Sequence, residues 1–156
     1  MRRPVPAAAI VWILVAFVPT ILAAEEEDRA AAVEVSVGAV IASNQGNDFD
    51  HRLTALRRQF DNLFSYSSYR LVKQQSQRVP WGGNAGFNVP GGPYVLVIPR
   101  EYKDERIFMK VVVIENSKPI VDTLLALRHR GTFLVGGHRH PDGVLILTIG
   151  ASPLPQ

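Results

Sequence analysis

The chain has 156 residues, of which 17 are lysine or arginine and 14 are aspartate or glutamate, so its formal net charge is +3. It contains no cysteine, which excludes a disulfide framework and a lipid anchor on an N-terminal cysteine. Arg2 and Arg3 lie in the first segment; without these two, the 17 basic residues become 15, nearly balancing the acidic ones. This balance gives no reason to expect a nucleic-acid partner.

Residues 1–24 have the three parts of a secretory signal peptide. A basic start is followed by an apolar run over 7–24, and an acidic stretch begins at Glu25. We expect cleavage after Ala24 and export to the periplasm or the cell exterior. The alternative is an uncleaved anchor, because about 18 apolar residues is close to the shortest helix that spans a bilayer. In that case this segment is the only expected contact with a membrane.

A strand and then a helix are expected at the start of the folded part. Valines alternate with other residues from position 33, which predicts a strand that ends near Ser43. After a polar loop with a capping residue at Asn47 or Asp48, apolar residues recur every three or four positions from Phe49 to Leu63. This spacing predicts an amphipathic helix whose apolar face consists of Leu53, Leu56, Phe60, Leu63 and Phe64.

The rest of the chain is typical of strands separated by turn residues. The expected strand segments are 66–79, 87–89, 94–98, 106–115, 120–127, a segment close to Phe133, and 144–149. We therefore predict an α+β fold, in which one N-terminal helix packs on a mainly antiparallel, β-rich sheet or small sandwich. It forms a single domain over 33–151, after a linker at 25–32 and before a tail at 152–156.

The segment HRHPD, residues 138–142, is the first candidate for chemistry. Residues two apart in a strand point the same way, so His138 and His140 can present two imidazoles to one ion, with Asp142 as a third ligand. The alternative interpretation is a hairpin turn, in which glycines and a proline reverse the chain and the polar side chains face water. We favour the turn, and we expect no cofactor.

Other catalytic patterns are missing from the sequence. It has no G-x-S-x-G nucleophile elbow and no glycine-rich phosphate loop ahead of a helix. Its acidic pairs lie in segments that are expected to be solvated, so nothing predicts a raised carboxyl pKa. The residues favour a non-catalytic protein and leave enzyme activity open. The catalytic alternative is a metal-dependent hydrolase that uses the HRHPD segment.

A group of aromatic and basic residues is the first candidate for ligand binding. Tyr66, Tyr69, Arg70 and Trp81 combine ring faces with a guanidinium, which suits an anionic polymer or a lipid head group. The alternative interpretation is a solvated helix face beside a half-buried strand. Export from the cytoplasm argues against nucleic acid as the partner.

Residues 94–137 contain a short pattern of threonine, alternating apolar residues and glycine pairs. It consists of Thr123, Leu125, Leu127, Gly131, Thr132, Val135, Gly136 and Gly137. This stretch resembles the hairpin region of the pore domain of bacterial secretins, although the chain is not a full-length secretin. The resemblance implies an envelope protein that is built from antiparallel hairpins and is concerned with secretion or pilus assembly.

Taken together, these features predict a small exported module of the cell envelope that acts by interaction or assembly and not by catalysis. Its expected partner is another envelope protein, and an anionic polymer or lipid is a further option. Two alternatives stay open: the metal-dependent hydrolase, and a binder of hydrophobic or anionic ligands in a concavity between helix and sheet.

Overall fold

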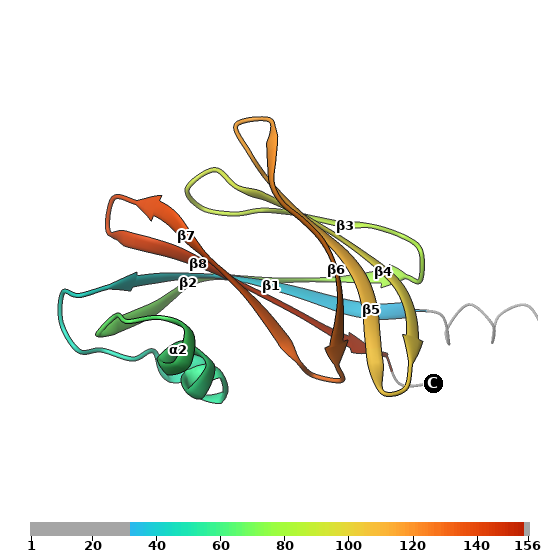
Figure 1. Ribbon diagram of the computed structural model, residues 1–156, viewed down its shortest axis with the longest axis horizontal. Coiled ribbons are helices and arrows are strands. Elements are labelled where there is room, and N and C mark those ends of the chain that lie inside the picture. The colour runs from blue at the N-terminus through green and yellow to red at the C-terminus, as the bar shows by residue number, and fades with distance from the viewer. Residues whose placement is uncertain (1–31, 155–156) are drawn as a thin grey trace, which may run out of the picture.

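The computed structural model describes residues 32–154, which form a sandwich of two antiparallel sheets (Figure 1). Each sheet has four strands, in the order β2-β1-β8-β7 for sheet A and β3-β4-β5-β6 for sheet B. The strands are β1 (Ala32–Ser43), β2 (Ser68–Pro80), β3 (Ala85–Asn88), β4 (Tyr94–Lys103), β5 (Arg106–Glu115), β6 (Lys118–Arg128), β7 (Thr132–His140) and β8 (Gly143–Pro153). The predicted signal peptide, the linker up to residue 31 and the end of the tail lie outside the described residues.

The predicted α+β class is wrong, because the fold is mostly β. The described chain has one short helical segment, which consists of the 3-10 helix η1 (His51–Leu56) and the α-helix α2 (Arg57–Leu63). It lies between β1 and β2 and is not N-terminal. The physical reason is length: thirteen residues make few helical turns, whereas alternating and β-branched residues fill eight strands.

The main core lies between the two sheets, because one face of each strand is apolar. In β1 the alternating residues Val33, Val35 and Val37 are buried, and in β5 the residues Ile107 and Met109 are buried in the same cluster. Since side chains alternate along a strand, the intervening residues of sheet B point away from this core. The alternation seen in the sequence therefore identified the inner face of the sandwich.

A second buried cluster lies on the opposite side of sheet A. Phe60 of α2 and Leu53 of η1 are buried there together with Val40, Tyr69 and Ile146 from the sheet. The Phe60 and Tyr69 ring centroids are 4.8 Å apart. Leu63, which the helical spacing assigned to the apolar face, is 63% exposed, because α2 ends there and the chain turns toward β2.

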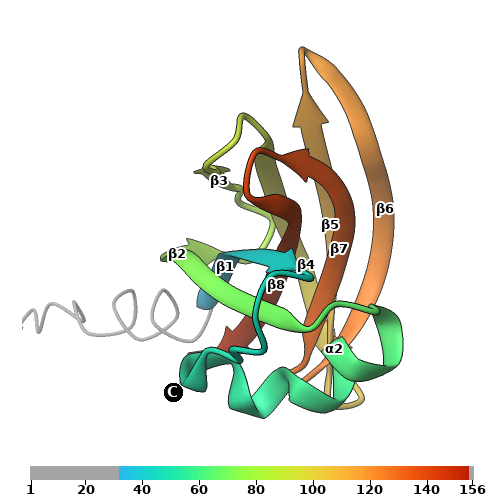
Figure 2. The ribbon, with the colours of Figure 1, turned by 90° about the vertical axis from the view of Figure 1, so that its left-hand side faces the viewer.

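Tight turns join the strands of sheet B into hairpins. The β4–β5 turn has positive φ at Asp104 and Glu105, and the β5–β6 turn has positive φ at Asn116 and Ser117. Two successive residues with positive φ match the twist of the flanking strands, which favours such two-residue connections. Figure 2 shows β6 as the outermost strand of sheet B. Within residues 32–154, no helix is long and apolar enough to cross a membrane.

Candidate functional site

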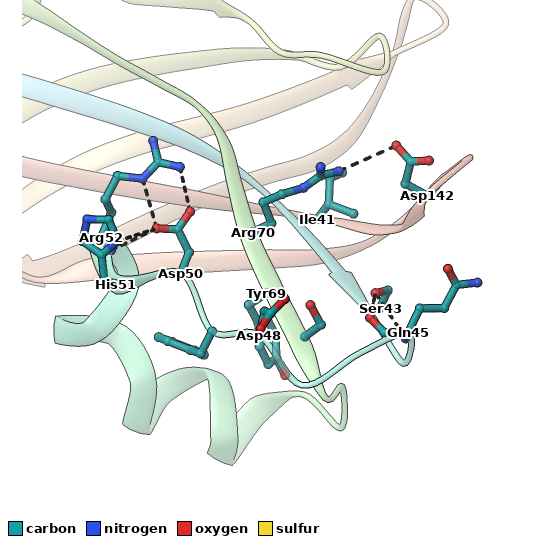
Figure 3. Close-up of a pocket in the computed structure, with 12 residues that line it drawn as sticks. Ile41, Ser43, Gln45, Asp48, Asp50, His51, Arg52, Tyr69, Arg70 and Asp142 are labelled. Carbon is teal, nitrogen blue, oxygen red and sulfur yellow. Dashed lines mark hydrogen bonds and ion pairs between the residues drawn. The ribbon is translucent and has the colours of Figure 1, made fainter.

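An open groove of about 820 Å³ lies where the end of β1, the start of β2 and the β7–β8 turn meet (Figure 3). Its lining is mostly polar and carries charges of both signs. The charged or titratable residues in the lining are Asp48, Asp50, His51, Arg52, Arg70 and Asp142. The groove thus brings together acidic, basic and imidazole groups from distant segments of the chain.

Asp50 anchors the segment before the helix to β2. Its carboxylate accepts hydrogen bonds from the Arg52 backbone N–H at 3.0 Å and from the Arg52 guanidinium at 3.0 and 2.7 Å. It also accepts the Leu71 backbone N–H at 3.1 Å, while the Arg52 guanidinium donates to the Leu71 carbonyl at 2.7 Å. Asp50 is therefore the N-cap of η1 and a link to the edge of β2.

The hydrogen bonds from Arg52 hold the pKa of the Asp50 carboxyl well below its usual range. Burial acts in the opposite direction, and the backbone N–H groups of Arg52 and Leu71 lower the pKa further. A carboxyl group that stays ionised near neutral pH is a poor general acid, and its lone pairs are already occupied. The Asp50 site is therefore built for structural stability and not for proton transfer.

Arg70 and Asp142, two residues that the sequence suggested for different reasons, meet at one end of the groove. The Arg70 Nη2 and Asp142 Oδ2 atoms are 3.8 Å apart, and both side chains are mostly exposed. An exposed ion pair of this kind contributes little to stability, because water and salt screen it. Both charges are accessible from solvent.

The four predicted ligand-binding residues do not form one site. Tyr69 is buried in the second cluster, and its ring stacks edge-on with Tyr66 at a centroid separation of 6.4 Å. Burial raises the pKa of the Tyr69 hydroxyl, so it stays protonated. Arg70 lines the groove, whereas Trp81 follows the far end of β2 and packs against the main core. Only Tyr69 and Arg70 line the groove together.

The prediction of a hairpin turn at the HRHPD segment is confirmed. His140 pairs with Gly143, so Pro141 and Asp142 alone connect β7 to β8. The histidines, however, are not the solvated side chains expected of a loop tip, since the His138 side chain is 13% exposed and the His140 side chain 19%. The β7 strand directs both of them toward the space between the sheets.

His138 meets an acidic residue from the other sheet. Its Nε2 atom lies 2.8 Å from Oε2 of Glu115, at the end of β5. The angle at this contact does not make a hydrogen bond, so Nε2 is a buried nitrogen without a hydrogen-bond partner in the described residues. At this short distance the contact joins sheet A to sheet B. Glu115 was not predicted, because only the packing of the two sheets brings it near β7.

His140 and Asp142 make local contacts instead of joining His138 at a common centre. The Asp142 backbone N–H donates to Nδ1 of His140 at 3.1 Å, and the Asp142 carboxylate faces Arg70. Across residues 32–154, no group of three or more His, Asp or Glu side chains is placed to hold a metal ion. The metal alternative therefore receives no support from these positions.

Two groups that line the groove, Asp50 and Tyr69, are each held in one protonation state. Asp50 is held ionised, and Tyr69 is held protonated, so neither is adjusted for acid or base chemistry near neutral pH. The helix cap was predicted at Asn47 or Asp48, whereas the structure has it at Asp50, which Arg52 holds in place. The signal was available, because an aspartate directly before an apolar helical pattern is a preferred N-cap.

Comparisons with protein-family models, with curated proteins and with solved structures found no match.

Proposed function

We propose that this protein is a small exported, non-catalytic interaction module, and that it binds another protein through the outer face of sheet B. The observation that carries the proposal is the composition of this face. Its outward positions on β4, β5 and β6 are mainly apolar: Tyr94, Leu96, Ile98, Phe108, Val112, Ile114, Ile120, Leu124 and Ala126. Leu124 is 74% exposed, the largest exposed fraction among the large hydrophobic side chains of the described chain.

Two opposite charges near the middle of this face form an ion pair, and Arg106 and Arg128 add positive charge at one end. Lys110 lies in its middle, and its Nζ atom is 3.2 Å from Oδ1 of Asp122 on the neighbouring strand. A hollow of about 430 Å³ lies beside them, lined in part by Phe108, Leu124 and Ala126. An apolar surface costs free energy while it faces water, at about 25 cal/mol per Å². Contiguous apolar patches on a protein that has a satisfied core elsewhere mark interaction surfaces.

No described element covers this face. The helical segment contributes to the cluster on the outer side of sheet A, and Figures 1 and 2 show no element beyond sheet B. The two sheets thus differ: the helical segment covers apolar side chains on the outer face of sheet A, whereas no described element covers those of sheet B.

Two features of the sequence support the envelope setting. Residues 1–24 have the pattern of a signal peptide. The residues that resemble the secretin hairpin region, 94–137, include β4, β5 and β6, which carry the apolar face. An envelope protein is therefore the partner that we propose, in a secretion or assembly process.

A photo-crosslinking amino acid at position 124 tests the proposal in the cells that produce the protein. The matched control places the same group at Gln59, an exposed residue of α2. We expect an adduct with one defined protein from position 124 alone, and binding that is reproduced with the two purified proteins. Leu124→Lys should weaken this binding by about tenfold or more, because it buries a charge in an apolar contact. Equal labelling from both positions would contradict the proposal.

A further inference from the structure

The two lateral sides of the sandwich differ in how their strand edges are protected. At the β2/β3 side, the Gln77 amide donates to the Gly86 carbonyl at 2.6 Å, and the Gln75 amide donates to the Asn88 carbonyl at 3.0 Å. Side chains of β2 therefore occupy the carbonyl groups of the short edge strand β3. An edge whose polar groups are already bonded cannot accept another strand.

The first part of β2 is protected by the segment that precedes η1. The Asp50 N–H donates to the Tyr69 carbonyl, and the Tyr69 N–H donates to the Asp48 carbonyl, each at 2.9 Å. The Asp50 carboxylate then accepts the next outward N–H, that of Leu71. The chain thus blocks its own edge over this stretch.

The β6/β7 side lacks this protection. In the described chain β6 pairs with β5 alone, so its other edge has no strand partner. The edge strand β7 is interrupted by a bulge between Val135 and His138, where Gly137 has a φ of 109°. Such a bulge discourages pairing along an edge. β6 has a register shift of its own near Pro119 and Ile120, but it pairs regularly with β5 from Val121 to Arg128, and over these residues its other edge is open.

The core itself is incompletely covered along this side. Side chains that pack on the main core and stay partly exposed there come from the two edge strands: Val121, Leu125 and Leu127 of β6, and Phe133 and Val135 of β7. We call this set the seam. Its counterparts near the centre of the sheets, such as Val111 and Val113, are fully buried.

One end of β6 places two arginines opposite each other. Arg128 lies directly opposite Arg106 in the β5–β6 register. Asp104 and Glu105 line the same hollow, but neither arginine forms an ion pair within residues 32–154. Like charges directly opposite each other in a sheet are destabilising. A carboxylate from outside the described chain would offset this repulsion.

From these observations we infer that β6 binds an extended segment of the partner as an additional antiparallel strand. The inference rests on the proposed function and names the form of the partner. Alternate side chains of that segment are apolar and cover the seam, while its backbone bonds to the free edge of β6. Because an antiparallel strand begins where β6 ends, its first residues lie beside Arg128, and we expect them to be acidic.

The test uses a labelled synthetic peptide that begins with two glutamates and then alternates valine with threonine. Fluorescence anisotropy measures its binding, and hydrogen exchange locates it. We expect the amides of residues 118–128 to exchange about tenfold more slowly with the peptide, and those of β3 to be unchanged. Two further peptides carry N-methyl groups, one at the odd positions and the other at the even positions. The N–H groups of a strand alternate between its two sides, so one peptide loses the groups that face β6 and should not bind, whereas the other should still bind.

A charge exchange tests the orientation. Arg128→Glu should weaken binding of the glutamate peptide by about tenfold and strengthen binding of a peptide that begins with two lysines, because opposite charges across strands attract. The control is Arg58→Glu, which makes the same charge change on the exposed surface of α2. If Arg58→Glu has the same effect, or if the two N-methylated peptides bind equally, the inference is wrong.

The outcomes separate the inference from the proposed function. Suppose that position 124 gives a specific adduct, but the peptide neither binds nor protects β6. This result would support the proposed interaction module and contradict the added strand. Peptide binding at β6 without any adduct in cells would overturn the proposed function and leave the edge as a competent strand acceptor. A stable dimer that protects β6 without peptide would assign the edge to a second copy and contradict the inference.

Discussion

Replacing Asp50 by asparagine tests whether one carboxylate holds the helical segment to the edge of β2. The amide keeps the shape of the side chain but has one acceptor oxygen in place of two. The Oδ2 position now accepts from Leu71 N–H and from Arg52, so an amide nitrogen there would face two donors. An unpaired buried N–H and a lost charge-assisted bond together cost about 2–3 kcal/mol, after a discount for the half-exposed Arg52.

This loss should lower the melting temperature by about 8–12 °C, since a domain of this size loses about 4 °C per kcal/mol. The matched control is Asp61→Asn, which breaks an exposed pair with Arg57 at 4.0 Å and should cost less than about 0.5 kcal/mol. Thermal unfolding followed by circular dichroism at neutral pH measures both. Equal losses for the two variants would refute the role of Asp50.

The same substitution changes the pH dependence of stability. Because the pKa of Asp50 is lowered on folding, its stabilising contribution is complete above its unfolded value of about 4. The contribution is lost as the pH falls through the lower folded value. The wild-type protein should therefore lose stability below about pH 4 more steeply than Asp50→Asn. Parallel acid profiles would show that the carboxylate is not a stabilising group.

Three further predictions follow from burial and backbone geometry. Phe60→Ala should destabilise by about 3–5 kcal/mol in urea unfolding, whereas Leu63→Ala should change stability by less than about 0.5 kcal/mol, because only the first side chain is buried. Gly143→Val should lower the free energy of unfolding by more than about 1 kcal/mol, since φ is 144° and an added Cβ would collide with the Ala42 carbonyl. An unchanged free energy of unfolding in the same assay would contradict the hairpin geometry. A metal chelator should leave the melting temperature unchanged, while His138→Ala should lower it by several degrees, because a mostly buried ring is removed. A lower melting temperature on chelation, or stoichiometric zinc by elemental analysis, would support the metal alternative.

Local sequence patterns determined much of the strand content. Alternation of apolar residues predicted the strand β1 and its buried valines, and the expected strand 106–115 matches β5 from Arg106 to Glu115. The turn residues of the β4–β5 and β5–β6 hairpins were also visible, because positive φ favours particular residue types at fixed places. These features depend on neighbours in the chain, so a sequence alone can specify them.

The tertiary structure decided the features that depend on strand order. The sequence placed the helical residues correctly but did not show that they are a short insertion between β1 and β2, so the α+β class was wrong. The predicted ligand site combined Trp81 with Tyr69 and Arg70, although Trp81 lies at the opposite end of β2. The sequence could not pair His138 with Glu115 or Arg70 with Asp142, because these contacts cross between strands far apart in the chain. An open edge on β6 has the same origin: hydrophobic periodicity fixes which side chains are apolar, but only the order of strands in the sheet fixes which of them remain uncovered.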